Sequence, residues 1–169
     1  VRILPLDKDF KADINLILTK ANLQNQIPSP RYSLKKPSEK NRIDLTTQQA
    51  LLFKGWLGED APPLPAVFSE SHDGGVRIWL HVPSIAERVV CESVLDVWIK
   101  QRAEAICLGD KWIPMINKPL KEACEFKVDQ VNEAITIRMD LNADGILKDW
   151  EFSLSLIKPT IEITNEHIE

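Results

Sequence analysis

Two alternating stretches joined by a turn signal constrain the fold of this chain most strongly. Residues 134–141 read AITIRMDL and residues 151–157 read EFSLSLI, so β-branched and apolar residues recur with a period of two on both sides. Asp144-Gly145 lies between the two stretches and is a pair typical of tight turns, because glycine adopts positive φ without strain. We therefore predict a β-hairpin and, with it, antiparallel sheet.

Further elements are predicted upstream of this hairpin. Residues 76–82 alternate as a strand after a turn at 73–75. Residues 93–107 carry an apolar stripe at helical spacing, and Ser93 with Asp96 three positions later forms a capping-box pattern at its start. A shorter helix is expected at 118–126, residues 46–53 are ambiguous, and 55–65 read as loop. The expected fold class is α+β, a mixed or antiparallel sheet with flanking helices.

The N-terminal part differs from the rest in pattern and in charge. Residues 8–26 have an amphipathic helical pattern, and 27–43 form a linker with three prolines and no periodicity. Residues 1–43 carry a formal charge of +5, which leaves −9 for residues 44–169. We therefore expect two parts, a basic N-terminal helix with a Pro-rich linker at 1–43 and a folded domain at 44–169.

The linker is the candidate for binding RNA, because such binding depends on basic side chains that displace counterions from phosphates. An acidic body repels phosphate, whereas residues 31–42 place one aromatic among five basic side chains. The alternative is a lysine-rich linker that is simply solvated. The candidate residues are Arg31, Tyr32, Lys35, Lys36, Lys40 and Arg42.

Composition excludes some classes of protein. A hydrophobic content of 44% and a charged content of 27% are typical of a folded globular domain. No run reaches 18 apolar residues and no signal-peptide pattern opens the chain, so we expect no membrane insertion and a location in the cytoplasm or in an organellar matrix or stroma. Cys91, Cys107 and Cys124 are widely spaced, and we expect buried free thiols instead of a zinc site or a disulfide.

About six short motifs occur in a fixed order over residues 42–168. They are RIDLT at 42–46, VRIWLHV at 76–82, LD at 95–96 followed by RA at 102–103, CL at 107–108 with IPM at 113–115, RMDLNADG at 138–145, and EF with SLI at 151–157. Their order and spacing resemble the RNB catalytic domain of the RNase II and RNase R exoribonucleases. The resemblance implies that residues 44–169 form an RNB-like half domain related to 3′-to-5′ exoribonucleases.

The same resemblance implies a metal site that this sequence does not complete. The family carries a D-x(5)-D-x-D-D-A cluster, whose carboxylates suit Mg²⁺ because this ion prefers oxygen ligands. Alignment backwards from Ala66-Val67 places other residues on the four acids, namely Trp56 or Leu57, then Pro62, Leu64 and Pro65. Glu59 and Asp60 are the nearest acids, but adjacent side chains of an extended chain point in different directions.

Three other family positions have also changed. Ser84 replaces the Asp of the H-I-A-D motif, and Cys107 and Asn165 replace two aromatic residues, of which the first resembles a base-stacking wall. We therefore assign no catalytic residue and no metal ligand, and we expect no cofactor, Mg²⁺ being expected only in an active nuclease. The resemblance stops at Glu169, about halfway through the family's catalytic domain, and the chain opens with Val1, so we expect it to be part of a longer or processed polypeptide.

The expected function is thus a degenerate RNB module without hydrolytic activity that binds RNA or a protein partner, with oligomerisation as one outcome. One alternative is a part of an active 3′-to-5′ exoribonuclease whose remaining half is not in this chain. Another is a calcium-binding protein, because Asp140, Asn142, Asp144, Gly145 and Glu151 fit the EF-hand loop pattern at every position. The alternating flanks favour a hairpin turn over that loop.

Two further expectations concern single residues. His81 matches the strand-end histidine of the family and is expected to be packed and hydrogen-bonded, because it has no evident acid or nucleophile partner. The tryptophans that fall on predicted elements are expected in the core, namely Trp79, Trp98, Trp112 and Trp150.

Overall fold

The computed structural model describes residues 16, 19–20, 35–55, 60–108 and 111–164. The chain divides into two compact units, Val1–Arg31 and Tyr32–Glu169. In the first unit Leu16, Thr19 and Lys20 are helical, and the rest of the helix predicted at 8–26 lies outside the described residues. The predicted division after residue 43 stays a prediction. The second unit holds all the elements discussed below.

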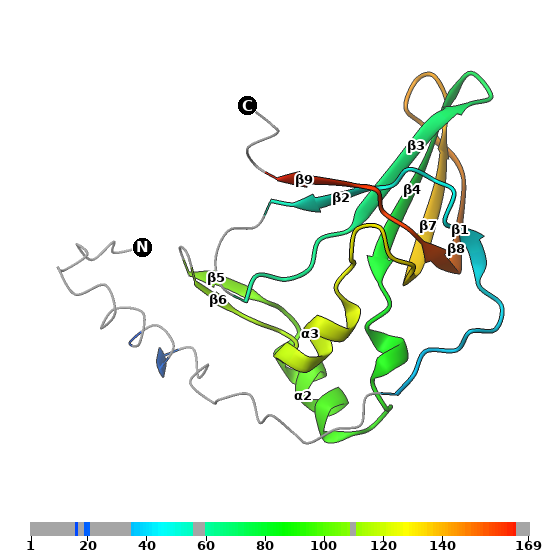
Figure 1. The fold of residues 1–169 in the computed structure, drawn as a ribbon. Coiled ribbons are helices and arrows are strands. Elements are labelled where there is room, and N and C mark those ends of the chain that lie inside the picture. Colours follow the sequence, from blue (N-terminus) through cyan, green and yellow to red (C-terminus); the bar gives the residue numbers. More distant parts are fainter. Residues whose placement is uncertain (1–15, 17–18, 21–34, 56–59, 109–110, 165–169) are drawn as a thin grey trace, which may run out of the picture. The chain divides into compact units, whose positions relative to one another are not determined.

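A mixed seven-stranded sheet forms the framework of the second unit (Figure 1). Its spatial order is β1-β8-β7-β4-β3-β2-β9, and β5 pairs with β6 in a separate two-stranded sheet. The pairs β1–β8 and β2–β9 are parallel, and the other pairs of the large sheet are antiparallel. The strands are β1 Ile43–Leu45, β2 Leu51–Lys54, β3 Ala66–His72, β4 Gly75–Pro83, β5 Ile106–Leu108, β6 Lys111–Ile113, β7 Asn132–Leu141, β8 Leu147–Ile157 and β9 Ile161–Thr164.

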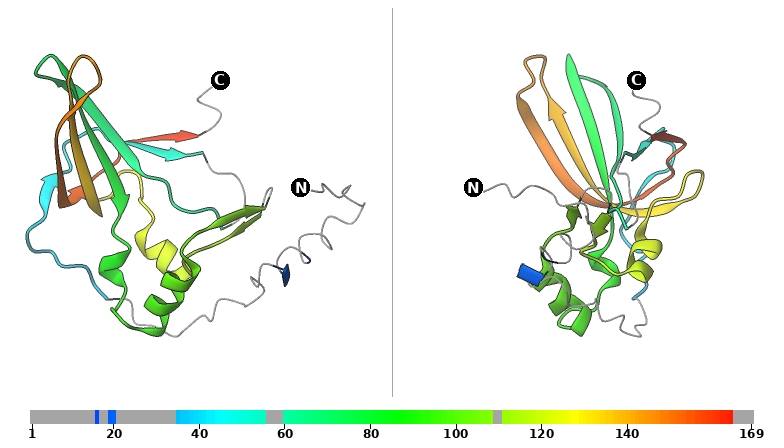
Figure 2. Two further views of the ribbon diagram at one scale, coloured as in Figure 1. Left: turned by 180° about the vertical axis from the view of Figure 1, so that it is seen from behind. Right: turned by 90° about the vertical axis from the view of Figure 1, so that its left-hand side faces the viewer.

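The predicted α+β class and the predicted hairpin are confirmed. β7 and β8 pair along their whole lengths, with one irregularity at Asp140/Leu141, and Gly145 adopts φ +76° in the connecting turn. β8 begins at Leu147, four residues before the predicted second stretch. The strand predicted at 76–82 is β4, but its partner β3 was not predicted from the sequence. The β3–β4 and β7–β8 hairpins lie side by side and extend away from the helices (Figure 2).

The helices meet the predictions in part. α2 spans Val94–Arg102 and starts as predicted, because the Ser93 hydroxyl accepts a hydrogen bond from the Asp96 amide at 3.2 Å. The helix predicted to reach residue 107 ends earlier, since Ala103 adopts a left-handed φ of 61° and residues 106–108 pair with β6. α3 spans Lys118–Cys124, and the Asn117 side chain caps it by accepting from the Leu120 amide. A short 3₁₀ helix, Ala86–Arg88, follows β4.

Two apolar clusters hold the elements together. One joins the strands to the segment after α3 and contains Ala50, Leu52, Ala66, Phe126, Ala134 and Ile157. The other joins α2 to α3 and contains Leu95, Ile116, Leu120 and Cys124. Burial of apolar side chains at about 25 cal/mol per Å² is the main stabilising contribution of such clusters.

Several burial predictions were wrong. Trp79 and Trp112 are buried as expected, but the Trp150 side chain is 56% exposed on β8. Cys124 is the buried free thiol that was expected, whereas Cys91 and Cys107 are exposed. Alternation along β8 identified a strand but not how much of it is covered, and every residue from Leu147 to Phe152 is exposed.

Candidate functional site

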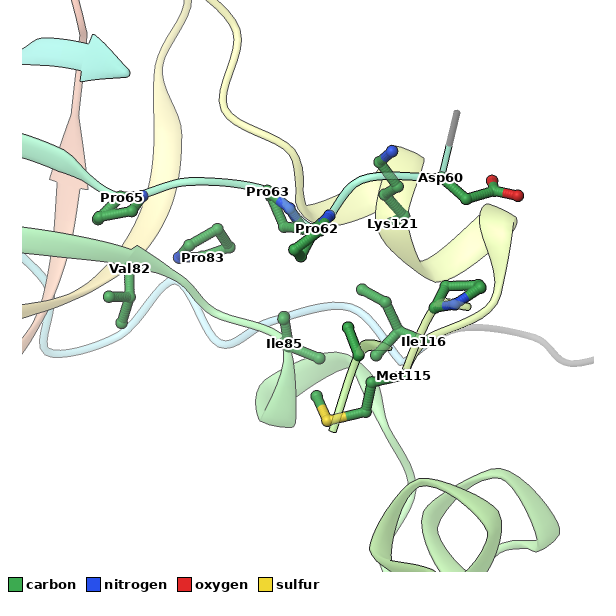
Figure 3. A pocket seen from close by; sticks show the side chains of 12 residues that line it. Asp60, Pro62, Pro63, Pro65, Val82, Pro83, Ile85, Met115, Ile116 and Lys121 are labelled. Carbon is green, nitrogen blue, oxygen red and sulfur yellow. The ribbon is translucent and has the colours of Figure 1, made fainter. Parts of the chain in front are cut away.

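The proline segment lines a pocket of about 450 Å³ at the base of the β3–β4 hairpin. In Figure 3 Pro62, Pro63 and Pro65 lie on one side of it, and Ile85 and Met115 lie on the opposite side. The remaining lining residues are Asp60, Val82, Pro83, Ala105, Pro114, Ile116 and Lys121. The wall is therefore almost entirely apolar, and it includes Pro62 and Pro65, two of the residues that the sequence alignment places on acids of the family.

The local sequence explains this arrangement. Proline has no amide hydrogen and fixes φ, so residues 62–65 join no strand and run extended into β3. Asp60 and Lys121 are the two charged residues of the lining, and Asp60 adopts φ 62° with its side chain at the rim. Among the described residues, no group of three or more His, Cys, Asp or Glu side chains is placed to hold a metal ion.

A buried polar cluster follows β4 next to this pocket. The Ser84 hydroxyl donates a short hydrogen bond to Glu87, and Arg42 Nη2 contacts the same carboxylate oxygen at 2.6 Å. Burial raises the pKa of Glu87, but the hydrogen bonds from Ser84 and Arg42 outweigh it, so that its pKa lies below the ordinary value. The Glu87 carboxylate is therefore ionised and held by side chains of the chain itself. The S-x-x-E spacing of Ser84 and Glu87 is the sequence signal that could have indicated this contact.

His81 lies at the end of a buried hydrogen-bond chain. The Ser155 hydroxyl reaches the Ala134 carbonyl, which can only accept, so the Ser155 oxygen is left to accept from Thr136. Thr136 Oγ1 then accepts from His81 Nδ1 at 2.8 Å. His81 Nε2 is buried and has no hydrogen-bond partner among the described residues. Its expected packing is confirmed, and burial lowers its pKa to about 4, so the imidazole is neutral at pH 7.

The segment that fits the EF-hand pattern is the turn between β7 and β8, without a helix on either side. Arg77 holds Asp140 through two contacts, Nε to Oδ1 at 2.5 Å and Nη2 to Oδ2 at 2.7 Å. Asn142 Oδ1 accepts from the amides of Asp144 and Ile146. Asp140 is thus held in an ion pair, and Asn142 is used in the turn itself. This use of two of the five matching residues does not favour the binding of calcium.

The predicted RNA-binding residues fall into three groups. Arg31 and Tyr32 lie outside the described residues. Lys35, Lys36 and Lys40 are exposed, and the Lys35 amide bonds the Arg88 carbonyl at 3.1 Å, which ties the segment to the folded unit.

Arg42 is placed differently, because its side chain is only 1% exposed. Besides Glu87, its guanidinium bonds the carbonyls of Ser38 at 2.8 Å and Ser155 at 3.3 Å. Arg42 therefore joins the linker to β8 and the 3₁₀ helix. The structure does not bring it together with the three exposed lysine side chains.

The chain is similar to proteins of known identity along most of its length. A sequence model described as the RNB domain matches residues 42–169. The chloroplastic/mitochondrial ribonuclease II of Arabidopsis thaliana is 26% identical over 168 residues, which cover 93% of this chain and 20% of that protein. Ribonuclease R of Chlamydia muridarum is 24% identical over 99 residues, covering 58% of this chain and 14% of that protein. The chain thus spans a fifth or less of the length of these two relatives.

Solved structures share the fold. Mycoplasma genitalium RNase R in complex with double-stranded RNA superimposes with a TM-score of 0.78 at 15% identity, covering 99% of this chain and 31% of that one. Yeast Ssd1, a pseudonuclease, superimposes with a TM-score of 0.73 at 15% identity, covering 95% of this chain and 22% of that one. At such identities the likeness concerns the fold alone. The family assignment rests on the match over residues 42–169, and by it this chain belongs to the RNB domain family of the ribonuclease II and ribonuclease R relatives.

Proposed function

We propose that this chain is a degenerate RNB module that binds single-stranded RNA without hydrolysing it. The observation that carries the proposal is the apolar pocket wall, in which Pro62 and Pro65 stand at two of the positions that the sequence alignment gives to the family's acids. Mg²⁺ demands several oxygen ligands in near-octahedral geometry and usually binds through carboxylates. Proline rings and leucine side chains offer none. Asp60 alone is too little to replace a cluster of four carboxylates.

The cluster beside the pocket supports the same proposal. In the resemblance Ser84 stands at the position of an aspartate, and its hydroxyl is engaged with Glu87. Glu87 is the acid nearest to Ser84 in the sequence, but it is neutralised by Arg42 at 2.6 Å. An ion-paired carboxylate is a poor ligand for a second cation, because binding would require the guanidinium to leave. The local charge balance therefore disfavours a metal ion at this end of β4.

The proposed contact with RNA is electrostatic and lies on the linker. Lys35, Lys36 and Lys40 are exposed, and the rest of the chain after residue 43 is acidic, so phosphates are attracted to the linker and repelled elsewhere. Arg31 and Tyr32 complete the proposed segment. Mycoplasma genitalium RNase R, whose structure is similar, has been solved in complex with double-stranded RNA and with ribose-methylated single-stranded RNA, which supports RNA as the ligand class.

The test is the salt dependence of binding. Fluorescence anisotropy with labelled single-stranded RNA should give a Kd that rises steeply with salt, and each phosphate contact contributes about 0.7 to the slope of log K against log salt. The variant with Lys35, Lys36 and Lys40 changed to Gln should lose about two units of that slope. The matched control changes Lys54, Lys118 and Lys148, which removes the same charge from other exposed positions. Equal losses in both triple variants would contradict the assignment to the linker.

The active enzyme is the alternative. The chain covers 20% of the length of the Arabidopsis relative, so further residues of a longer polypeptide or of a second chain could in principle complete a nuclease. The altered acids argue against this, because completion elsewhere does not restore ligands at 62, 64 and 65.

The chloroplastic/mitochondrial location of the Arabidopsis relative also supports an organellar location for this chain, beside the cytoplasmic one. No helix in the described part of the chain is long and apolar enough to cross a membrane.

A further inference from the structure

The lysine segment, residues 35–42, is fastened to the rest of the folded unit at both of its ends. At its start the Lys35 amide donates a hydrogen bond to the Arg88 carbonyl at 3.1 Å. At its end the Arg42 guanidinium contacts the Glu87 carboxylate at 2.6 Å. Glu87 and Arg88 are consecutive residues of the 3₁₀ helix that follows β4. One short helix therefore holds both ends of the segment that carries the three exposed lysines.

Contacts within the segment fix its shape as well. Arg42 Nε donates to the Ser38 carbonyl at 2.8 Å, and the Lys40 amide donates to the Ser38 hydroxyl at 3.2 Å. Asn41 adopts a left-handed φ of 62° in this turn, a conformation that asparagine tolerates better than most residues. Pro37 restricts the backbone further, because its ring fixes φ. The exposed lysines thus project from one backbone conformation.

The Arg42 side chain is poorly placed to contact a phosphate. It is 1% exposed, and its three guanidinium nitrogens are engaged with the Glu87 carboxylate and with the carbonyls of Ser38 and Ser155. The Glu87 carboxylate also accepts from the Ser84 hydroxyl, so the partner of Arg42 is itself held in place. A phosphate would reach Arg42 only after this ion pair had opened. Arg42 therefore differs from the lysines, although it belongs to the same basic run of the sequence.

We propose that Arg42 is a positioning residue, which together with Glu87 holds the lysine segment in the conformation that binds RNA. This inference rests on the proposed function, since it concerns how the same lysines act. Ordering a loop at an interface opposes binding, so a segment that is already ordered binds more tightly than a free one with the same charges. The two anchoring residues then raise the affinity for RNA without contacting it, whereas the three exposed lysines determine its salt dependence.

Charge alone predicts the opposite effect for Glu87. Removing this carboxylate leaves every basic side chain in place and takes away one negative charge, so simple electrostatic attraction would strengthen the binding of RNA. If the carboxylate positions the segment, its removal weakens binding instead. Arg42 allows a second separation of the two roles. A lysine at position 42 keeps the positive charge but cannot reproduce the three contacts of the planar guanidinium, so it keeps the attraction for phosphate and loses the anchor.

The test combines anisotropy with labelled single-stranded RNA and hydrogen exchange of the Lys35 amide. Glu87→Ala and Arg42→Lys should each raise the Kd for RNA by about three- to tenfold, while the slope of log K against log salt stays that of the wild type. In both variants the Lys35 amide should exchange about tenfold faster, because its bond to the Arg88 carbonyl opens more often. Glu133→Ala is the matched control. It removes the carboxylate that pairs with the Arg88 side chain at 2.8 Å, and it should change neither the Kd nor the exchange.

Circular dichroism and the melting temperature establish that each variant is folded. The neutral double variant Arg42→Met with Glu87→Gln leaves no unpaired buried charge, and it replaces a single variant that fails to fold. It should show the same rise in Kd and an unchanged salt slope. A slope lower by about 0.7 in the double variant would show that Arg42 contacts a phosphate and would overturn the proposal.

Three further results would contradict the positioning role. They are unchanged affinity in folded Glu87→Ala and Arg42→Lys, tighter binding by Glu87→Ala, and an equal loss of affinity in Glu133→Ala. If the variant without the three lysines loses its salt slope while the anchor variants bind normally, only the positioning role is refuted. A wild-type chain that binds no RNA would refute the proposed function and this inference with it, even where slow exchange of the Lys35 amide shows that the anchor is formed.

Discussion

Replacing His81 tests the buried hydrogen-bond chain through the pH dependence of stability. The pKa of His81 is about 4 in the folded chain against an ordinary value of 6.5. The unfolded chain therefore takes up a proton between these two values before the folded one does. The contribution of the neutral His81 side chain to stability is fully present above pH 6.5, and it falls as the pH is lowered towards 4. A difference of about 2.5 units at 1.36 kcal/mol each corresponds to a loss of about 3 kcal/mol.

The cause of the low pKa determines the choice of variant. Protonation would place N–H on Nε2, which has no acceptor among the described residues, whereas Nδ1 already donates to Thr136. His81→Asn keeps a donor near the position of Nδ1 and removes the titration. We expect it to be less stable than the wild type at pH 7 by about 1–3 kcal/mol, because a cavity replaces part of the ring.

Urea unfolding at pH 7 and at pH 4.5, followed by circular dichroism, measures both effects. The free energy of unfolding should fall with pH more steeply in the wild type than in His81→Asn. Acid-sensitive carboxylates contribute equally to both proteins, so the difference between their pH slopes reports His81. Identical pH slopes for wild type and His81→Asn would refute the assignment of a neutral, buried imidazole.

Two further predictions concern stability. Arg42→Met should lower the free energy of unfolding by about 2–4 kcal/mol in urea, because it leaves the Glu87 carboxylate partly buried without its cation. The double variant with Glu87→Gln should recover much of that loss. Additive losses in the two single variants and the double variant would contradict the pairing. Ala103→Gly should raise the free energy of unfolding by up to about 1 kcal/mol, since Ala103 holds a left-handed φ of 61° at the end of α2, and a lower melting temperature would argue against that conformation.

The sequence predicted elements whose signals are local. The β7–β8 hairpin follows from period-two alternation around Asp144-Gly145, and the start of α2 follows from the cap at Ser93. The helix was predicted to reach residue 107 because Ile106 continues the apolar stripe. In the structure α2 ends at Arg102, and Ile106 pairs with Ile113 as a strand residue. β3 was not predicted because only the first half of its sequence, AVFSESH, is apolar, and its pairing with β4 is not visible in the sequence.

The sequence predicted that metal ligands are missing from the site, but not how the remaining residues are arranged around the pocket. Pro62, Leu64 and Pro65 can be read from the sequence as non-ligands, but the pocket that Pro62 and Pro65 help to line depends on segments 50 residues further on, such as that of Met115. The burial of Arg42 was equally hidden, because a basic residue in a lysine-rich linker has the composition of a solvated segment. Its partner Glu87 lies 45 residues away, and only the tertiary fold joins them.

An RNB scaffold without the oxygen ligands for a magnesium ion should bind RNA without cleaving it. The most direct measurement incubates the full chain with end-labelled single-stranded RNA and Mg²⁺, with an active ribonuclease R as the positive control for substrate and metal. We expect the RNA to be recovered at full length while anisotropy reports that it was bound. Mg²⁺-dependent release of nucleotides from the 3′ end, retained by the chain after repurification, would contradict it.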